Sequence, residues 1–354
     1  MADEQRRWFT LTELLVCIVL FGLIVALLGP NMDEGRERAR LTTCYNNLRQ
    51  LALANIERAT RDNQVAFGGY LEPLKTAGDQ PPDEDPTTES RELMVAWPTR
   101  LLPSLDSMTL YQKIVDSIAD DASLFAQPPA TGIFLCPSDS QLEAVPGGLS
   151  YVVNSGMPDL ISPSESQPSD LKANGVCHDQ RPGRFGPQVR LGRDLKDGAS
   201  RTILLSENIH RDPPGSASQP GNTWLRPAAG ATNLEQWYGM VWVVDPQHPR
   251  SPQAALLDRF NRDTRPESQR DQPYAASGTR FARPASNHPD VFIVAFCEGN
   301  TRTISQDIDY AVYQQLMTPD GQKAAPADAP NQRFEKTLPD DERFMNPTLT
   351  DADY

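Results

Sequence analysis

The feature that most constrains this chain is an apolar stretch near its amino end. Arg6 and Arg7 precede the twenty residues 9–28, in which Glu13 is the one charged side chain. A helix of that length covers roughly 30 Å, which matches the hydrocarbon core of a bilayer. Positive charge before an apolar run stays in the cytoplasm. We therefore expect one span of the inner (cytoplasmic) membrane, with a cytoplasmic amino terminus and the bulk of the chain outside.

Three interpretations of the stretch are open. A cleaved secretory signal would have a shorter apolar core and small residues at a cleavage site, whereas this core ends at Gly29 and Pro30. A plain signal anchor explains every residue except Glu13, because a charge one turn inside the membrane is costly. The third interpretation is a segment that a peptidase cleaves and whose Glu13 carboxylate then takes part in assembly. This interpretation would explain Glu13 as well.

The string from Phe9 to Val16, after a short basic leader at residues 1–8, resembles the prepilin-type processing segment of type IV pilins and type II secretion pseudopilins. In that family a prepilin peptidase cleaves before the phenylalanine and methylates the new amino terminus. The resemblance implies that Glu13, the fifth mature residue, neutralises the amino group of a neighbouring pilin-like subunit. The family has glycine before the cleavage point, whereas this chain has Trp8. A bulky indole should hinder the peptidase, so cleavage is left open.

Beyond the apolar stretch, residues 29–60 have a helical and amphipathic pattern. Leu41, Cys44, Leu48, Leu51 and Asn55 recur at spacings of three and four, and arginines occupy the other face. This pattern predicts a helix that lies against a globular domain.

The rest of the chain predicts an α+β fold with a mainly antiparallel sheet. Proline accounts for 32 of the 354 residues, which favours loops and short strands over long helices. The predicted strands alternate with Pro-, Gly- and Ser-rich segments, and they cover residues 131–135, 150–153, 201–206, 240–244, 291–297 and 301–305. We expect one extracytoplasmic domain over residues 61–324 and a flexible, acidic and proline-containing tail over 325–354.

Segments 95–105, 134–139, 149–154 and 195–207 resemble a bacterial family of prepilin-type proteins with a large extracytoplasmic domain of unknown function. The carboxy-terminal signature of that family is a histidine, nine residues and Asp-Gly. Here His288 is followed by nine residues and then by Glu298 and Gly299. The resemblance implies an architecture but no activity.

The residues alone leave three pairings open for the four cysteines outside the apolar stretch. Cys44 and Cys136 both fall within segments that resemble the family. The resemblance therefore favours a disulfide between these two.

The signature is expected to be structural. The run 291–297 is apolar on both alternating faces and predicts a buried strand, which would hold His288 and Glu298 roughly 20–30 Å apart. We expect His288 to order the start of this strand, and Glu298 and Gly299 to form the turn into the next one.

No catalytic constellation is recognisable, and we expect neither an enzyme nor a cofactor. The formal net charge of −14 argues against nucleic acid as a partner, and the scattered histidines argue against a zinc site. The prediction is a membrane-anchored, pilin-like structural protein of a type IV pilus-like or type II secretion-like assembly. The alternative is an envelope-binding module on a pilin-type anchor, with a stacking platform formed by Trp224, Trp237, Tyr238 and Trp242. Packing of these aromatic residues in the core is the competing interpretation.

Overall fold

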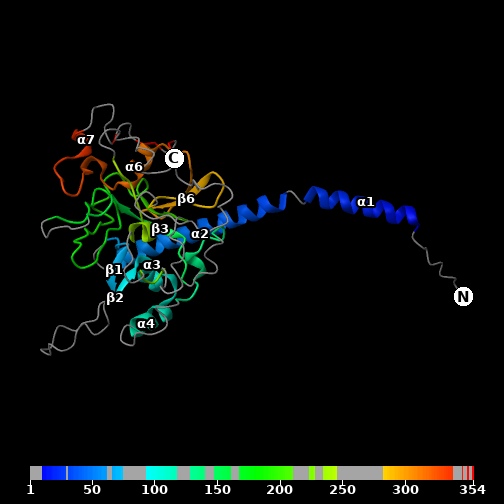
Figure 1. The fold of residues 1–354 in the computed structure, drawn as a ribbon, viewed down its shortest axis with the longest axis horizontal. Helices are drawn as coiled ribbons and strands as arrows, with labels where there is room; N and C mark the ends of the chain where they lie inside the picture. The colour runs from blue at the N-terminus through cyan, green and yellow to red at the C-terminus, as the bar shows by residue number, and fades with distance from the viewer. Residues whose placement is uncertain are drawn as a thin grey trace, which may run out of the picture.

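The computed structural model describes residues 10–28, 31–61, 66–74, 93–117, 128–139, 147–160, 167–209, 223–227, 234–244, 282–337, 345, 349–350 and 353–354. These residues form helices and two β-sheets in a mixed α+β architecture, which confirms the α+β part of the prediction (Figure 1). The shorter helical elements are α3 (Trp97–Leu101), η1 (Leu102–Leu105), α4 (Met108–Ser117), η3 (Gly132–Phe134), α5 (Leu234–Tyr238), α6 (Tyr310–Met317), η7 (Gly321–Lys323) and α7 (Phe334–Thr337).

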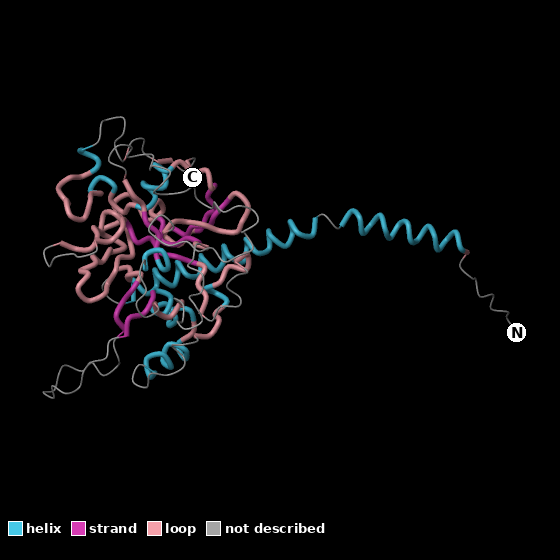
Figure 2. Tube along the Cα trace, in the orientation of Figure 1, coloured by secondary structure: helices cyan, strands magenta, loops and turns pink. Residues whose placement is uncertain are grey.

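Two helices form the amino-terminal part. α1 (Leu11–Leu28) lies beyond the first turns of α2 (Asn31–Arg61), away from the strands (Figure 2). The large apolar side chains of α1 between Leu11 and Phe21 are exposed. Among the residues with described structure, no helix has both the length and the hydropathy that crossing a membrane requires. The membrane span expected at residues 9–28 stays a prediction.

The main sheet has five strands in the order β5-β3-β4-β6-β7. The pairing of β3 with β5 is parallel, and the other three pairings are antiparallel, so the sheet is mainly antiparallel as expected. A separate antiparallel pair, β1 with β2, was not predicted. The strands are β1 (Leu71–Leu74), β2 (Leu93–Ala96), β3 (Tyr151–Gly156), β4 (Ile203–Glu207), β5 (Gly239–Val241), β6 (Val291–Phe296) and β7 (Thr301–Ser305).

β6 separates the two halves of the core. Its side chains alternate, so that Ile293 and Ala295 join the cluster that includes the buried face of α2. Phe292 and Val294 join a second cluster, which contains residues of α6. The strand is buried on both faces, as its unbroken apolar sequence predicts.

The turn after β6 lies at Glu298 and Gly299, where the sequence predicts it. Gly299 has φ +94°, a conformation that residues with a side chain rarely adopt, and its N–H donates to the carbonyl of Phe296 at 2.9 Å. A Cβ at this position would lie 2.9 Å from Leu53 of α2. The glycine therefore serves both the turn and the close approach of helix and hairpin.

The prediction of a strand at residues 131–135 is wrong. This segment forms the 3₁₀ turn η3, in which the N–H of Phe134 donates to the carbonyl of Thr131. The turn buries the Phe134 ring against Trp224, with ring centroids 5.3 Å apart. Tertiary packing of one aromatic residue therefore overrides the local β propensity.

The prediction of a flexible tail at residues 325–354 is also wrong for the part that the structure describes. Ala325 and Phe334 are buried, and the ring of Phe334 packs edge-on against Trp242 with centroids 6.0 Å apart. Leu349 joins the same cluster. Widely spaced apolar residues of the tail join α6 on the face of the sheet opposite α2, although they form no local pattern.

Candidate functional site

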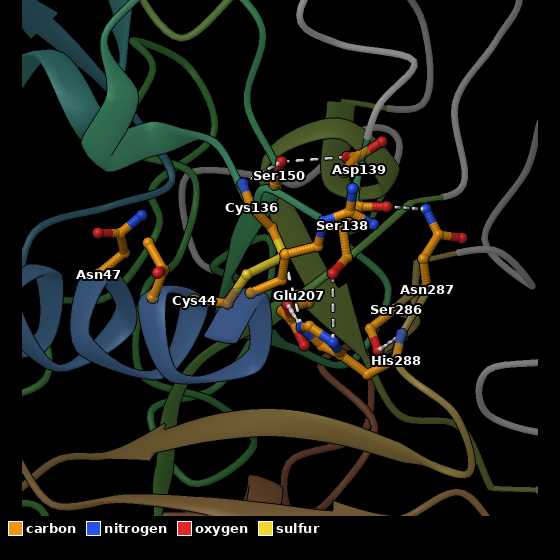
Figure 3. Close-up of a disulfide and its surroundings, with 12 residues drawn as sticks. Cys44, Asn47, Cys136, Ser138, Asp139, Ser150, Glu207, Ser286, Asn287 and His288 are labelled. Atoms are coloured by element: carbon orange, nitrogen blue, oxygen red, sulfur yellow. Dashed lines mark hydrogen bonds and ion pairs between the residues drawn. A yellow bond between two sulfur atoms is a disulfide. The ribbon is translucent and has the colours of Figure 1, made fainter. Parts of the chain in front are cut away.

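The side of α2 that faces the domain carries a covalent attachment. Cys44 is bonded to Cys136, which lies 92 positions later and two residues after the end of η3 (Figure 3). Both residues are buried. The amphipathic spacing of α2 points Cys44 at the domain, and η3 brings Cys136 to it.

Beside the disulfide, His288 lies between two carboxylates. Its Nδ1–H donates to Glu37 Oε1 of α2 at 2.6 Å, and its Nε2 lies 3.4 Å from Glu207 Oε1 at the end of β4. The same Nε2 lies 3.5 Å from the Sγ atom of Cys136. We call Cys44, Cys136, Glu37, Glu207 and His288 the junction cluster.

Loop residues hold the junction cluster in place. Ser138 Oγ donates to Glu37 Oε1 at 2.9 Å, and its carbonyl accepts from Asn287 Nδ2 at 2.8 Å. The backbone N–H of Cys136 donates to Ser150 Oγ, which in turn donates to Asp139 (Figure 3). The segment before β6 is therefore tied to the segment that carries Cys136.

Burial and charge act in opposite directions on His288. Burial disfavours its charged form, but hydrogen bonds and negative charge from Glu207 and Glu37 outweigh this effect and raise the pKa of His288. Burial also raises the pKa of Glu207, and His288 offsets only part of that rise. The imidazolium form thus bridges a carboxylate of α2 and a carboxylate of the sheet.

This arrangement does not form a nucleophile–base pair. Ser138 Oγ lies 3.4 Å from His288 Nδ1, but the serine hydroxyl and the Nδ1–H both donate to Glu37. No lone pair of the imidazole is therefore directed at the serine oxygen, as a general base would require. The junction cluster attaches α2 to the domain.

α2 has a second ionic attachment near its carboxyl end. Arg58 binds Glu72 of β1 through two nitrogens, with Nη1 2.8 Å from Oε1. The Nε atom of Arg100 in α3 lies 3.5 Å from the same carboxylate. Burial alone would raise the pKa of Glu72, but Arg58 and then Arg100 lower it. The Glu72 carboxylate thus stays charged between two cations.

A cavity of about 580 Å³, lined by both polar and apolar residues, opens beside this second attachment. Arg58, Glu72 and Arg100 line it together with Gln180 and Gln188. Two guanidinium groups share one carboxylate, so these residues leave one positive charge in excess. The cavity can accept a small ligand with an anionic group and hydroxyls.

A group of buried acids lies around Tyr70, near β1. The Tyr70 hydroxyl donates to Asp159 Oδ2 at 2.6 Å, and Asp159 N–H donates to Glu235. Burial and then neighbouring acidic groups raise the pKa of Asp159 to about 6, and they raise that of Glu235 well above its usual value. Arg181 neutralises Asp179 of the same group with a hydrogen bond of 2.6 Å.

The structure separates the residues expected at the signature. His288 belongs to the junction cluster, whereas Glu298 and Gly299 lie at the other end of β6, where Glu298 N–H donates to the carbonyl of Ala199. The cysteines that are bonded are the pair that the resemblance implied, Cys44 and Cys136.

The expected processing residues lie at or before the start of α1. Trp8 and Phe9 fall outside the described residues. Glu13 Oε2 accepts hydrogen bonds from the backbone N–H and the hydroxyl of Thr10, each at 2.9 Å.

Sequence reasoning did not identify Glu37 or Glu207 as site residues. A signal for Glu207 was present, because segments 134–139 and 195–207, which carry the family resemblance, both contact His288 here. The prediction of an aromatic stacking platform is wrong, because Trp224, Tyr238 and Trp242 are buried. The interpretation as core packing is correct for these three residues.

A model of the family described as "Protein of unknown function (DUF1559)" matches residues 33–311. This match begins in α2 and ends in α6, so it includes every residue of the junction cluster. No curated protein and no solved structure matches the chain.

Proposed function

The chain belongs to this family of proteins of unknown function, and from that premise we propose that it is a membrane-anchored, pilin-like structural protein of the cell envelope. The observation that carries the proposal is the junction cluster. A disulfide and a buried His–carboxylate bridge attach α2 to the sheet domain close to the end from which α1 extends. An attachment of this kind suits a helix that transmits force to its domain.

The surface of α1 supports the anchoring half of the proposal. Its apolar side chains, including Leu11, Ile18 and Phe21, are more than half exposed. A continuous apolar surface of this kind is favourable only when it is covered. Lipid of the inner membrane and the corresponding helices of other pilin-like subunits are the proposed cover. Nucleic acid is not a proposed partner.

Glu13 has a role in this proposal. Its carboxylate contacts Thr10 of its own chain in the structure. In an assembly it would instead pair with the amino group of a neighbouring subunit, as the prepilin resemblance implies. A buried carboxylate needs such a partner.

The proposal is tested with Glu13→Gln in the native host, with Glu57→Gln as a control at an exposed position of α2. We expect both variants to remain in the membrane fraction. Polymers or detergent-stable complexes should be lost at least tenfold in Glu13→Gln and remain at the wild-type level in Glu57→Gln. Complexes that persist unchanged in Glu13→Gln would refute the assembly mechanism, and recovery of the chain in the soluble fraction would refute the anchor.

The fate of the leader is a separate test. Prepilin peptidase would leave a mature chain that begins at methylated Phe9, whereas the indole of Trp8 argues for retention of residues 1–8. Intact-mass measurement of the native protein distinguishes the two products. A Trp8→Gly variant should be cleaved at least as completely as the wild type, and a lower cleaved fraction would show that this peptidase does not act here.

The cavity beside Arg58 and Arg100 favours a second candidate function, display of an envelope-binding module on the same anchor. Its excess positive charge and its glutamine side chains suit an acidic sugar. Glucuronate is the probe, and glucose is its uncharged control. Saturation-transfer NMR should detect glucuronate only, and Arg100→Gln should abolish the signal. Equal signals from both sugars, or none, would reject this candidate.

A further inference from the structure

The junction cluster contains four side chains that metal ions accept as ligands. Cys44 Sγ, Cys136 Sγ, His288 and Glu207 each offer one ligand atom, and these atoms lie within 4.8 Å of one another. All four residues are buried, and Figure 3 shows their side chains converging on the disulfide. They come from four separate parts of the chain, so no local spacing of cysteine and histidine indicates them.

Two of the distances between these atoms match those of a tetrahedral zinc shell. Zinc–sulfur bonds of about 2.3 Å and zinc–nitrogen or zinc–oxygen bonds of about 2.0–2.1 Å place neighbouring ligand atoms about 3.3–3.5 Å apart. His288 Nε2 lies 3.5 Å from Cys136 Sγ and 3.4 Å from Glu207 Oε1. The two sulfur atoms would need to separate to about 3.8 Å, which requires that their covalent bond be broken.

The surrounding hydrogen bonds orient both non-sulfur ligands. Glu37 accepts the Nδ1–H of His288, which reserves Nε2 for a metal ion, as carboxylate partners of metal-binding histidines do. Glu207 Oε2 accepts the backbone N–H of Ile293 at 3.0 Å. Its other oxygen, Oε1, is buried and faces Nε2 of His288 at 3.4 Å. An oriented buried oxygen of this kind is an available ligand atom.

We propose that reduction of the Cys44–Cys136 disulfide converts the junction cluster into a four-coordinate Zn²⁺ site with Cys44, Cys136, His288 and Glu207 as ligands. A dithiol reductant supplies two electrons and two protons and becomes a disulfide itself, while the chain gains two thiols. Zn²⁺ then displaces both thiol protons and the Nε2 proton of His288. Glu207 completes the shell through Oε1.

The metal ion would take over the mechanical role of the disulfide. In both redox states Cys44 of α2 stays connected to Cys136, and the reduced state gains connections to β4 and to the segment before β6. The helix would thus remain attached to the domain under reducing conditions, where a disulfide alone would be lost.

The test compares the oxidised and the phosphine-reduced full-length chain, each stripped of metal by a chelator and then given Zn²⁺ or Co²⁺. The phosphine takes an oxygen atom from water and becomes its oxide, which leaves the thiols free. We expect one metal ion per reduced chain by elemental analysis and none per oxidised chain. Co²⁺ should give a thiolate-to-metal charge-transfer absorption in the reduced sample only.

Variants assign the ligands. His288→Asn and Glu207→Gln should weaken Zn²⁺ binding to the reduced chain at least tenfold, and Glu37→Gln should weaken it about 10–100-fold through the orientation of His288. Cys177→Ala/Cys297→Ala removes the buried free thiols and should leave stoichiometry and affinity unchanged. Binding that survives in Cys44→Ser/Cys136→Ser, or that is lost in the Cys177/Cys297 control, would overturn the proposal.

A refolding experiment covers the case in which the reduced chain is unstable. The chain is reduced in denaturant and diluted with or without one equivalent of Zn²⁺. The proposal requires a larger refolded fraction with Zn²⁺, because an ion that binds only the folded state stabilises it. An equal or smaller refolded fraction would overturn it.

Discussion

The two attachments of α2 differ in chemistry although they belong to one helix. Near α1, Cys44 is covalently bonded and Glu37 pairs with a histidine that loses its charge at high pH. Near the carboxyl end, Arg58 and Arg100 hold Glu72 through ion pairs and hydrogen bonds, with no covalent bond. A pull that arrived through α1 would reach the junction cluster before the Arg58–Glu72 pair. The covalent connection therefore lies where a filament or membrane anchor would load the helix.

The largest expected effect comes from breaking the ionic attachment. Arg58→Met leaves the Glu72 carboxylate buried with a weaker counterion and should lower the free energy of unfolding by about 3–5 kcal/mol. Urea denaturation measures this loss. The matched control is Arg61→Met, which removes an exposed pair with Glu57 and should cost about 0–1 kcal/mol. Equal losses in the two variants would mean that burial of the pair does not matter.

The next effect comes from breaking the covalent attachment. Cys44→Ser/Cys136→Ser releases a constraint across 92 positions and should lower the free energy of unfolding by about 2–4 kcal/mol. Cys17→Ser, at an exposed position of α1, is the control and should change nothing. Hydrogen exchange should show faster opening around Cys44 than around Arg58. Uniform acceleration along α2 would contradict the division into two attachments.

Between the two attachments, α2 contacts the β6–β7 hairpin through apolar packing. Gly299→Ala forces a side chain into a positive-φ turn and against Leu53, so we expect a loss of about 1–3 kcal/mol. Thermal unfolding measures it, with Gly132→Ala, where a Cβ meets no atom within 4 Å, as the control. A cost of Gly299→Ala no larger than that of the control would show that the close approach is unimportant.

The smallest expected effect is a pH dependence of stability, which has opposite signs for Glu72 and for the buried acidic residues around Asp159. The pKa of Asp159 is raised from 3.8 to about 6, so its contribution to stability is present below pH 3.8 and is lost as pH rises through about 6. Glu72 has the opposite sign, because its lowered pKa adds stability that is lost as pH falls below 4.5. The charged and titratable groups around Asp159 are Tyr70, Asp170, His178, Asp179, Arg181 and Glu235.

Asp159→Asn should remove most of the decline in stability between pH 3.8 and about 6 and stabilise the chain at neutral pH. Urea denaturation across this pH range measures the slope. An exposed substitution, Asp116→Asn in α4, should leave the slope unchanged. A slope that is the same in wild type and Asp159→Asn would mean that another group titrates.

The helices and strands that were predicted correctly are those whose pattern lies within a short stretch of sequence. The helical spacing of Leu48 and Leu51 indicated α2, and the two-faced apolar run with Gly299 indicated β6 and its hairpin. Short strands such as β1, which contains Pro73 and Glu72, were missed because their pairing and burial are tertiary. The packed tail was missed because Phe334 finds its partners only in the folded chain.

The junction cluster was predictable only in part. The resemblance pointed to its two cysteines and to His288, but it did not show that these residues meet Glu37 and Glu207. Glu37 and His288 are 251 positions apart, and no periodicity links residues at that distance. Long-range proximity of polar side chains depends on strand order, and the sequence leaves strand order open.

The long sequence separation between Glu37 and His288 also delays the formation of their contact during synthesis. Chains emerge from the ribosome at about 5–20 residues per second, so roughly 10–50 s pass between the appearance of one end of this bridge and the other. During that interval α2 exists without the strand β6 that buries much of its inner face. The inner face of α2 in a newly made chain is therefore exposed to the α2 helices of other new chains until its own β6 is synthesised. We expect co-translational contacts between neighbouring chains to involve this face of α2.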